Sequence, residues 1–119
     1  MAQYLPLFRP GQTVTFDVTT AVTGGQPVEV GAADRSVAPA AAGTNKYVGI
    51  AGHDAAVGDT VTVEVGKPVH LLTASGAIAR GAKLETAGAG RVRTLTTGTN
   101  IGIALTAAAD AAAVQVLQA

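Results

Sequence analysis

The first residues that could do chemistry are His53 and Asp54, which stand side by side in a predicted connection between two strands. An imidazole next to a carboxylate is suited to general acid–base catalysis. Catalysis also needs a nucleophile or a metal within hydrogen-bond reach, and the sequence offers no second cluster of reactive residues. We interpret the pair as part of a solvated turn, expect no catalytic residues, and predict that the protein is not an enzyme.

The other histidine, His70, stands in the run PVHLL, where we expect a strand residue that points away from the core. Two histidines this far apart, in a chain without cysteine, form a weak set of metal ligands. The glycine-rich run GAGR from Gly88 lacks the lysine and hydroxyl residue that end a phosphate-binding loop. We therefore expect no metal, no cofactor and no small-molecule substrate.

The charge of the chain is balanced, with eight basic and eight acidic residues. Nucleic-acid-binding proteins carry a basic patch that neutralises phosphates, whereas here the basic residues come close together only at Arg80 with Lys83 and Arg91 with Arg93. No apolar run approaches the roughly 18 residues of a membrane span, and no signal-peptide pattern occurs at the N-terminus. We expect a soluble protein with neither a nucleic acid nor a membrane as partner.

The elements that hold these residues include a sequence repeat. The stretch VGIAGHDAAVGDTVTV from Val48 returns 53 positions later as IGIALTAAADAAAVQV from Ile101, and GQPV from Gly25 is echoed by GKPV from Gly66. An internal duplication within one β domain explains both matches. The alternative is coincidence in a chain rich in Ala, Val and Gly, because compositional bias imitates motifs.

Apolar and polar residues alternate along the chain with the period of a half-buried strand, for example at Val14, Phe16 and Val18 within 13–19. Short strands separated by Gly-rich turns are typical of an all-β barrel or sandwich. The Ala-rich tracts 38–43 and 106–112 have room for at most one or two short helical turns. The remaining strands are expected at 28–30, from 37, and at 47–51, 60–65, 68–73, 82–86, 91–96, 101–105 and 113–117.

Residues 1–12 differ from the rest of the chain, because apolar side chains gather there while two prolines prevent a helix. We predict an extended N-terminal arm over 1–12, followed by a single β domain over 13–119 with pseudo-repeats at about 25–65 and 66–117. With four aromatic residues and many alanines the core is thin, which favours burial of further surface in an oligomer or on a partner.

Three segments carry a resemblance to a known family: PLFRPGQTVTF from Pro6, YVGIAGHDAAVGDTVTVEVGKPV from Tyr47 and NIGIAL from Asn100. With these the chain resembles the decoration, or cement, proteins of tailed-phage heads. The resemblance implies a mostly β protein, often a homotrimer, that lies on the capsid surface of the virion and clamps neighbouring major capsid proteins. It also implies a structural role without catalysis.

The arm is our candidate for the contact with the capsid or with an adjacent subunit. An arm folded back on its own barrel is the alternative, because chain ends often dock as a strand. The candidate contact residues are Tyr4, Leu5, Pro6, Leu7, Phe8, Arg9 and Pro10.

Two other functions stay open. Another phage module, such as a tail or fibre base, would share this composition and β pattern. The run VGDTVTVEVGKPV also resembles the biotinyl/lipoyl-like β-hammerhead domains, although Lys67 lacks the hairpin-tip context of their modified lysine.

Overall fold

The protein is described by a computed structural model that covers residues 13–119, and this range contains strands and no helix. Every strand expected from the sequence is present, and the all-β class is confirmed. The predicted arm, residues 1–12, lies outside the described residues. The strands are β1 (Thr13–Val18), β2 (Pro27–Val30), β3 (Ser36–Pro39), β4 (Tyr47–Ala51), β5 (Thr60–Glu64), β6 (Val69–Ala74), β7 (Lys83–Gly88), β8 (Arg91–Thr94), β9 (Gly102–Ala104) and β10 (Ala113–Gln118).

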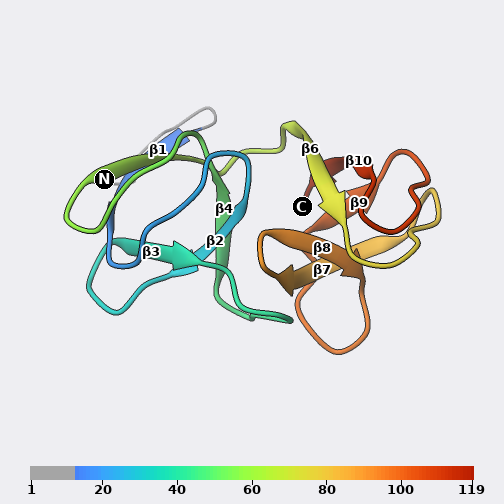
Figure 1. Cartoon of the computed structure of the whole chain (residues 1–119), viewed down its shortest axis with the longest axis horizontal. Helices are drawn as coiled ribbons and strands as arrows, with labels where there is room; N and C mark the ends of the chain where they lie inside the picture. Colours follow the sequence, from blue (N-terminus) through green and yellow to red (C-terminus); the bar gives the residue numbers. More distant parts are fainter. Residues whose placement is uncertain (1–12) are drawn as a thin grey trace, which may run out of the picture.

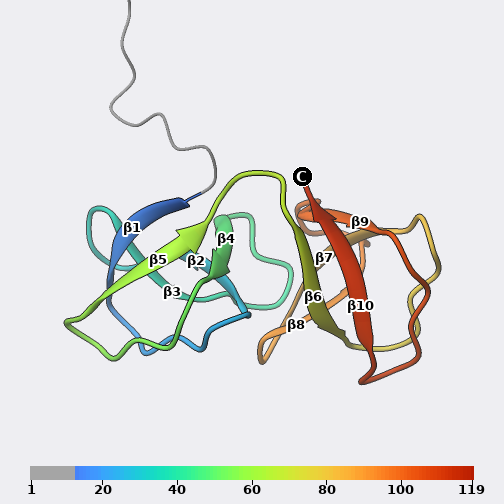
Figure 2. The same cartoon turned by 90° about the horizontal axis from the view of Figure 1, so that it is seen from above.

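The strands close into two small barrels that lie side by side (Figures 1 and 2). The strand order is β1-β3-β2-β4-β5 in the first barrel and β10-β6-β8-β7-β9 in the second. In each barrel one pair is parallel, β1 with β3 and β6 with β8, and the other pairs are antiparallel. Both barrels lie within the segment 13–119. The sequence analysis predicts a single β domain for this segment, and that domain assignment stays a prediction.

The two barrels have equivalent strand pairing, which confirms the internal duplication. In the first barrel Ile50 pairs with Glu64, and 53 positions later Ile103 pairs with Leu117. The other strands correspond with a slightly larger spacing of 56 or 55 positions: the pair Val30 and Val37 of β2 and β3 has its counterpart in Thr86 and Val92 of β7 and β8. Each strand of one barrel therefore has an identifiable counterpart in the other.

The GxPV echo is not part of this equivalence. Gly25 has φ +80° in the turn before β2, and its structural counterpart is Gly81, with φ +84° in the turn before β7. Both turns close with a backbone hydrogen bond over four residues, and glycine supplies the left-handed conformation without strain. Gly66 instead precedes β6, the counterpart of β1, so the interpretation of GQPV and GKPV as matching starts of two units is wrong.

The first barrel holds a core of mainly valine side chains, and the second a mixture of Val, Ile, Leu and Ala; the β-branched residues among them suit the pleated surface of a sheet. The two cores are not separate, because Ile50 of the first barrel packs into the cluster of the second. The first cluster contains Val18, Val22, Val28, Val37, Ala51, Val61 and Val63; the second contains Ile50, Leu72, Ala74, Ile78, Leu84, Val92, Ile101, Ala104, Val114 and Val116.

The Ala-rich tracts form no helical turn in the structure. In the tract 106–112, Ala108 exchanges backbone hydrogen bonds with Ile78, and the amide of Ala111 donates to the carbonyl of Ala74. A seven-residue segment gains little from helix propensity, so these bonds to Ile78 and to β6 determine its conformation.

Candidate functional site

The side chains of His53 and Asp54 both form hydrogen bonds with the surrounding backbone. Asp54 Oδ1 accepts a hydrogen bond from the amide of Gly24 at 2.8 Å, and His53 Nε2 accepts one from the amide of Thr62 at 3.3 Å. His53 Nδ1 lies 2.9 Å from the carbonyl oxygen of Asp54. The two side chains therefore fasten turns to neighbouring strands, in agreement with a structural interpretation of the pair.

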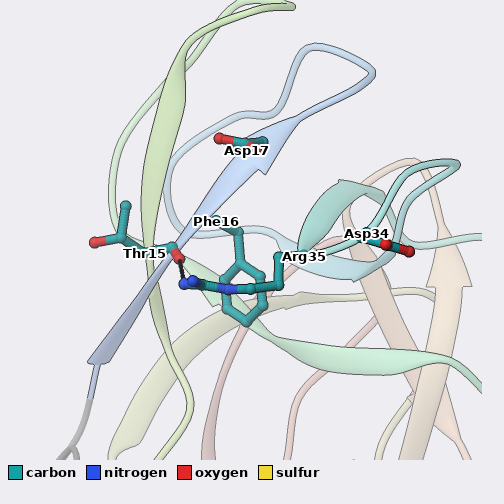
Figure 3. A pocket seen from close by; sticks show the side chains of 5 residues that line it. All are labelled: Thr15, Phe16, Asp17, Asp34 and Arg35. Carbon is teal, nitrogen blue, oxygen red and sulfur yellow. Dashed lines mark hydrogen bonds between the residues drawn. The ribbon is translucent and has the colours of Figure 1, made fainter. Parts of the chain in front are cut away.

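A surface hollow of about 380 Å³ lies beside β1 and the loop before β3 (Figure 3). Arg35 Nη2 donates to the carbonyl oxygen of Thr15 at 2.9 Å. Figure 3 shows the carboxylates of Asp17 and Asp34 on different sides of Phe16 and not turned towards the guanidinium. These groups do not converge on one point, as the reacting groups of an active site would.

Among residues 13–119 no group of three or more His, Asp or Glu side chains is placed to hold a metal ion. In the same part of the chain no helix is long and apolar enough to span a membrane.

A buried carboxylate, Glu85, holds the loop that follows β8. Its Oε2 accepts from both Nε and Nη2 of Arg93, and its Oε1 accepts from the amides of Thr96 and Gly98. The amide of Thr96, followed by Arg93 and the amide of Gly98, lowers the pKa of Glu85 to about 2. The carboxylate is fully enclosed and satisfied, so it organises structure and is not available to a substrate.

Glu29 occupies the counterpart position in the first barrel and performs the same task. Its Oε1 accepts from the amide of Ala41, the counterpart of Thr96, at 2.9 Å. This bond is the main cause that lowers the pKa of Glu29. The duplicated glutamates therefore fix two corresponding loops, 41–44 and 96–99, one on each barrel.

The seam between the barrels is closed by the side chain of Gln118. Its Oε1 accepts from Tyr47 Oη at 3.0 Å and lies 3.1 Å from His70 Nε2, while its Nε2 donates to the carbonyl oxygens of Glu64 and Gly66. Burial raises the pKa of Tyr47 and is the largest cause that lowers the pKa of His70. His70 shares the inward face of β6 with Leu72, so the expectation that it points away from the core is wrong.

Five large apolar side chains gather on the outer face of β6, β10 and β9 in the second barrel. The register aligns Val69, Leu117 and Ile103 in one row across the three strands. Leu71 and Leu105 flank Gln115 in the next row, and Leu71 is 67% exposed. We call these five residues the apolar face; contiguous exposed apolar side chains of this kind mark binding surfaces.

The first barrel shows that the fold does not require this apolar face. The counterparts of Val69 and Leu71 in β1 are Thr13 and Thr15, and the counterpart of Leu117 in β5 is Glu64. A barrel of the same topology closes with polar residues at these three positions, whereas the counterpart of Ile103 is the apolar Ile50. The apolar side chains of the second barrel are therefore available for a function other than folding.

None of the candidate contact residues in the arm, Tyr4 to Pro10, lies within the described residues. The sequence interpretation missed the apolar face, because PVHLL reads as core and the strand alternation around His70 is ambiguous. Aligning Val69 and Leu71 with Thr13 and Thr15 would have identified it.

Comparisons with known proteins agree with the all-β fold. No curated protein matches the chain. Among solved structures, the head fiber gp8.5 N base of bacteriophage phi29 is similar in fold, with a TM-score of 0.70 and 20% sequence identity over 90% of this chain and 92% of that chain. The sequence model of the phage cement proteins matches residues 8–118. The chain therefore belongs to the phage cement protein family.

Proposed function

We propose that this protein binds the outer surface of a phage capsid and stabilises the lattice of the major capsid protein without catalysis. It is made in the host cytoplasm and becomes part of the virion, as a homotrimer. The observation that carries the proposal is the exposed apolar face of the second barrel. The family assignment supports it, because the chain belongs to the phage cement proteins. Full burial of an exposed apolar side chain contributes about 1.5–3 kcal/mol, and each of the partly covered side chains of the apolar face would contribute a part of that.

The apolar face is tested by the substitution Leu71→Asp. Because Leu71 is exposed, the variant is expected to fold, and a charge at the centre of the contact would weaken capsid binding by at least about tenfold. The matched control is Thr15→Asp, at the counterpart position on β1. Co-sedimentation with capsids that lack the protein measures both variants, and equal binding of L71D and T15D would exclude the apolar face as the capsid contact.

The second proposed contact is the N-terminal arm, with Tyr4, Leu5, Pro6, Leu7, Phe8, Arg9 and Pro10 as contact residues. Its apolar side chains would gain from lying along a capsid subunit or adding a strand to a sheet edge. Deletion of residues 2–10 is expected to weaken capsid binding while leaving the melting temperature of the barrels unchanged. Undiminished binding of the folded deletion variant would refute the contact, and a lowered melting temperature would favour an arm folded back on its own barrel.

A head fibre base is the second candidate function, and the fold similarity to the gp8.5 N base favours it. The two functions differ in what the protein carries. A cement protein ends at the capsid surface, whereas a fibre base supports a projecting domain or partner. Electron micrographs of virions distinguish them, because a fibre would extend beyond the density of two small barrels.

A further inference from the structure

The charges of the chain divide unequally between the two barrels, although the chain as a whole is neutral. Residues 13–64 carry six acidic and two basic side chains, a formal charge of −4, whereas residues 65–119 carry two acidic and five basic ones, a formal charge of +3. The barrels lie side by side, so charge of opposite sign falls on the two ends of the molecule (Figure 2). Such a distribution orients a protein when it meets a charged surface.

The basic charge of the second barrel includes two lysines at the edge of the apolar face. Lys83 of β7 pairs with Ile103, so the row across β6, β10 and β9 continues onto a fourth strand and ends in an ammonium group. Lys83 lines a hollow of about 160 Å³ with Ile103 and Leu117, and Lys67, which precedes β6, lines the same hollow. Both lysines are exposed, and within residues 13–119 neither forms an ion pair.

The two acidic side chains of the second barrel lie elsewhere. Glu85 is fully enclosed and forms an ion pair with Arg93. Asp110 precedes the start of β10, and its Oδ1 accepts from the amide of Gly76 at 2.8 Å. The row that ends in the lysine crosses β10 near its other end, at Leu117. The lysines therefore give this edge of the apolar face a positive potential.

The corresponding face of the first barrel has the opposite character. Its row contains Thr13 and Glu64, and it ends at Pro27, the counterpart of Lys83. Asp17 stands farther along β1, at the counterpart position of Thr73. The duplicated fold thus presents an acidic, hydroxyl-rich face on one barrel and an apolar, lysine-edged face on the other.

We propose that the apolar face binds a segment of the major capsid protein in which carboxylates lie beside apolar side chains, with Lys67 and Lys83 against the carboxylates. The inference rests on the proposed function and names the barrel and the partner chemistry of that contact. The acidic first barrel is turned away from the capsid, because like charges disfavour the opposite orientation. An apolar row beside two lysines fits a protein surface better than a nucleic acid, which requires a larger basic patch.

A salt titration of capsid binding measures the contribution of the two lysines. Lys67→Gln/Lys83→Gln is expected to bind capsids that lack the protein about three- to tenfold more weakly at about 50 mM salt, because each exposed charge contributes a small, screened attraction. At about 1 M salt the difference should shrink to less than about twofold, since screening then acts within about 3 Å. The matched control, Ala56→Glu/Val57→Glu, lowers the net charge equally on an exposed turn of the first barrel and should bind like the unmodified protein.

Carbodiimide coupling on the capsid identifies the groups that meet. The reagent activates a carboxylate, and a lysine amine in contact with it forms an amide while the reagent leaves as a urea. The unmodified protein should become linked to the major capsid protein through Lys67 or Lys83, as located by mass spectrometry of the linked peptides. The control Lys67→Arg/Lys83→Arg keeps both charges but has no amine to couple, so it should bind equally and lose these links.

Several outcomes would overturn the inference while capsid binding, and with it the proposed function, stands. These are binding that does not change with salt, equal binding of the glutamine variant and its control, and absence of links at the two lysines. Links from carboxylates of the first barrel to capsid lysines would assign the opposite orientation, and links of Lys67 or Lys83 only to a second copy of the chain would assign the face to a contact between copies. An unmodified protein that does not bind capsids would refute the proposed function and this inference together.

Discussion

Replacement of Gln118 by methionine removes the hydrogen bonds that close the seam between the barrels. Methionine has nearly the same length, so the change deletes the amide without opening a large cavity. The side chain is buried, and it connects four groups: Tyr47 Oη, His70 Nε2 and the carbonyl oxygens of Glu64 and Gly66. The substitution therefore separates the contribution of the seam from that of the two barrel cores.

The expected magnitude follows from the number and exposure of these bonds. Each hydrogen bond in a protein contributes a net amount of about 0.5–1.5 kcal/mol to the free energy of unfolding. We use the lower part of this range, because the partners of Gln118 are partly exposed and can form hydrogen bonds with water in the variant. Four bonds then contribute about 2–4 kcal/mol, and the more apolar methionine offsets some of this. We expect the free energy of unfolding to fall by about 2–3 kcal/mol and the melting temperature by about 10 °C.

Differential scanning calorimetry measures this change, with Gln115→Met as the matched control on the exposed side of the same strand. The control should shift the melting temperature by no more than about 2 °C. A double-mutant cycle with Tyr47→Phe should give a coupling energy of at least about 0.5 kcal/mol. Equal melting temperatures for Q118M and Q115M, or additive effects in the cycle, would refute the assignment of Gln118 as the link between the barrels.

Two further predictions concern the turns and the buried carboxylates. Ala111 has φ +65°, and its counterpart in the first barrel, Gly58, has φ +89°. The substitution Ala111→Gly should therefore relieve left-handed strain and raise the free energy of unfolding by about 0.5–1 kcal/mol, as measured by urea titration. The control Ala109→Gly, at a position without positive φ, should not stabilise the protein. Because hydrogen bonds lower the folded-state pKa of Glu85 to about 2, its contribution is complete above the ordinary carboxyl pKa and is lost as the pH falls towards 2. Melting temperatures should therefore decline between about pH 5 and pH 2, and a Glu85→Gln variant with an equally steep decline would contradict this cause.

The strands and the fold class could be predicted because local sequence determines them. TVTVEV alternates valine with polar residues, and β5 buries Val61 and Val63 on one face as that pattern requires. The duplication was also visible where β4 and β5 share residues with β9 and β10. It was invisible in β1 and β6, because the barrel fold constrains only their inward positions, such as Phe16 and Leu72.

The surfaces could not be predicted, because they depend on which barrel faces solvent and which faces a neighbour. Val30 and Thr86 occupy the same place in their barrels, yet one is exposed and the other is buried under loop 41–44. The apolar face escaped prediction for a related reason: Leu71 and Leu72 are adjacent and chemically alike, and only the register with β10 decides that Leu72 enters the core.

Electron cryo-microscopy of capsids that lack the protein, before and after addition of the purified chain, tests capsid binding most directly. The added protein should appear as pairs of small barrels on the outer surface, with the apolar face of β6, β10 and β9 or the chain that precedes β1 against the capsid subunits. The same capsids should then withstand a higher temperature before they release their DNA. Capsids without added outer density, or density confined to the tail, would contradict the account.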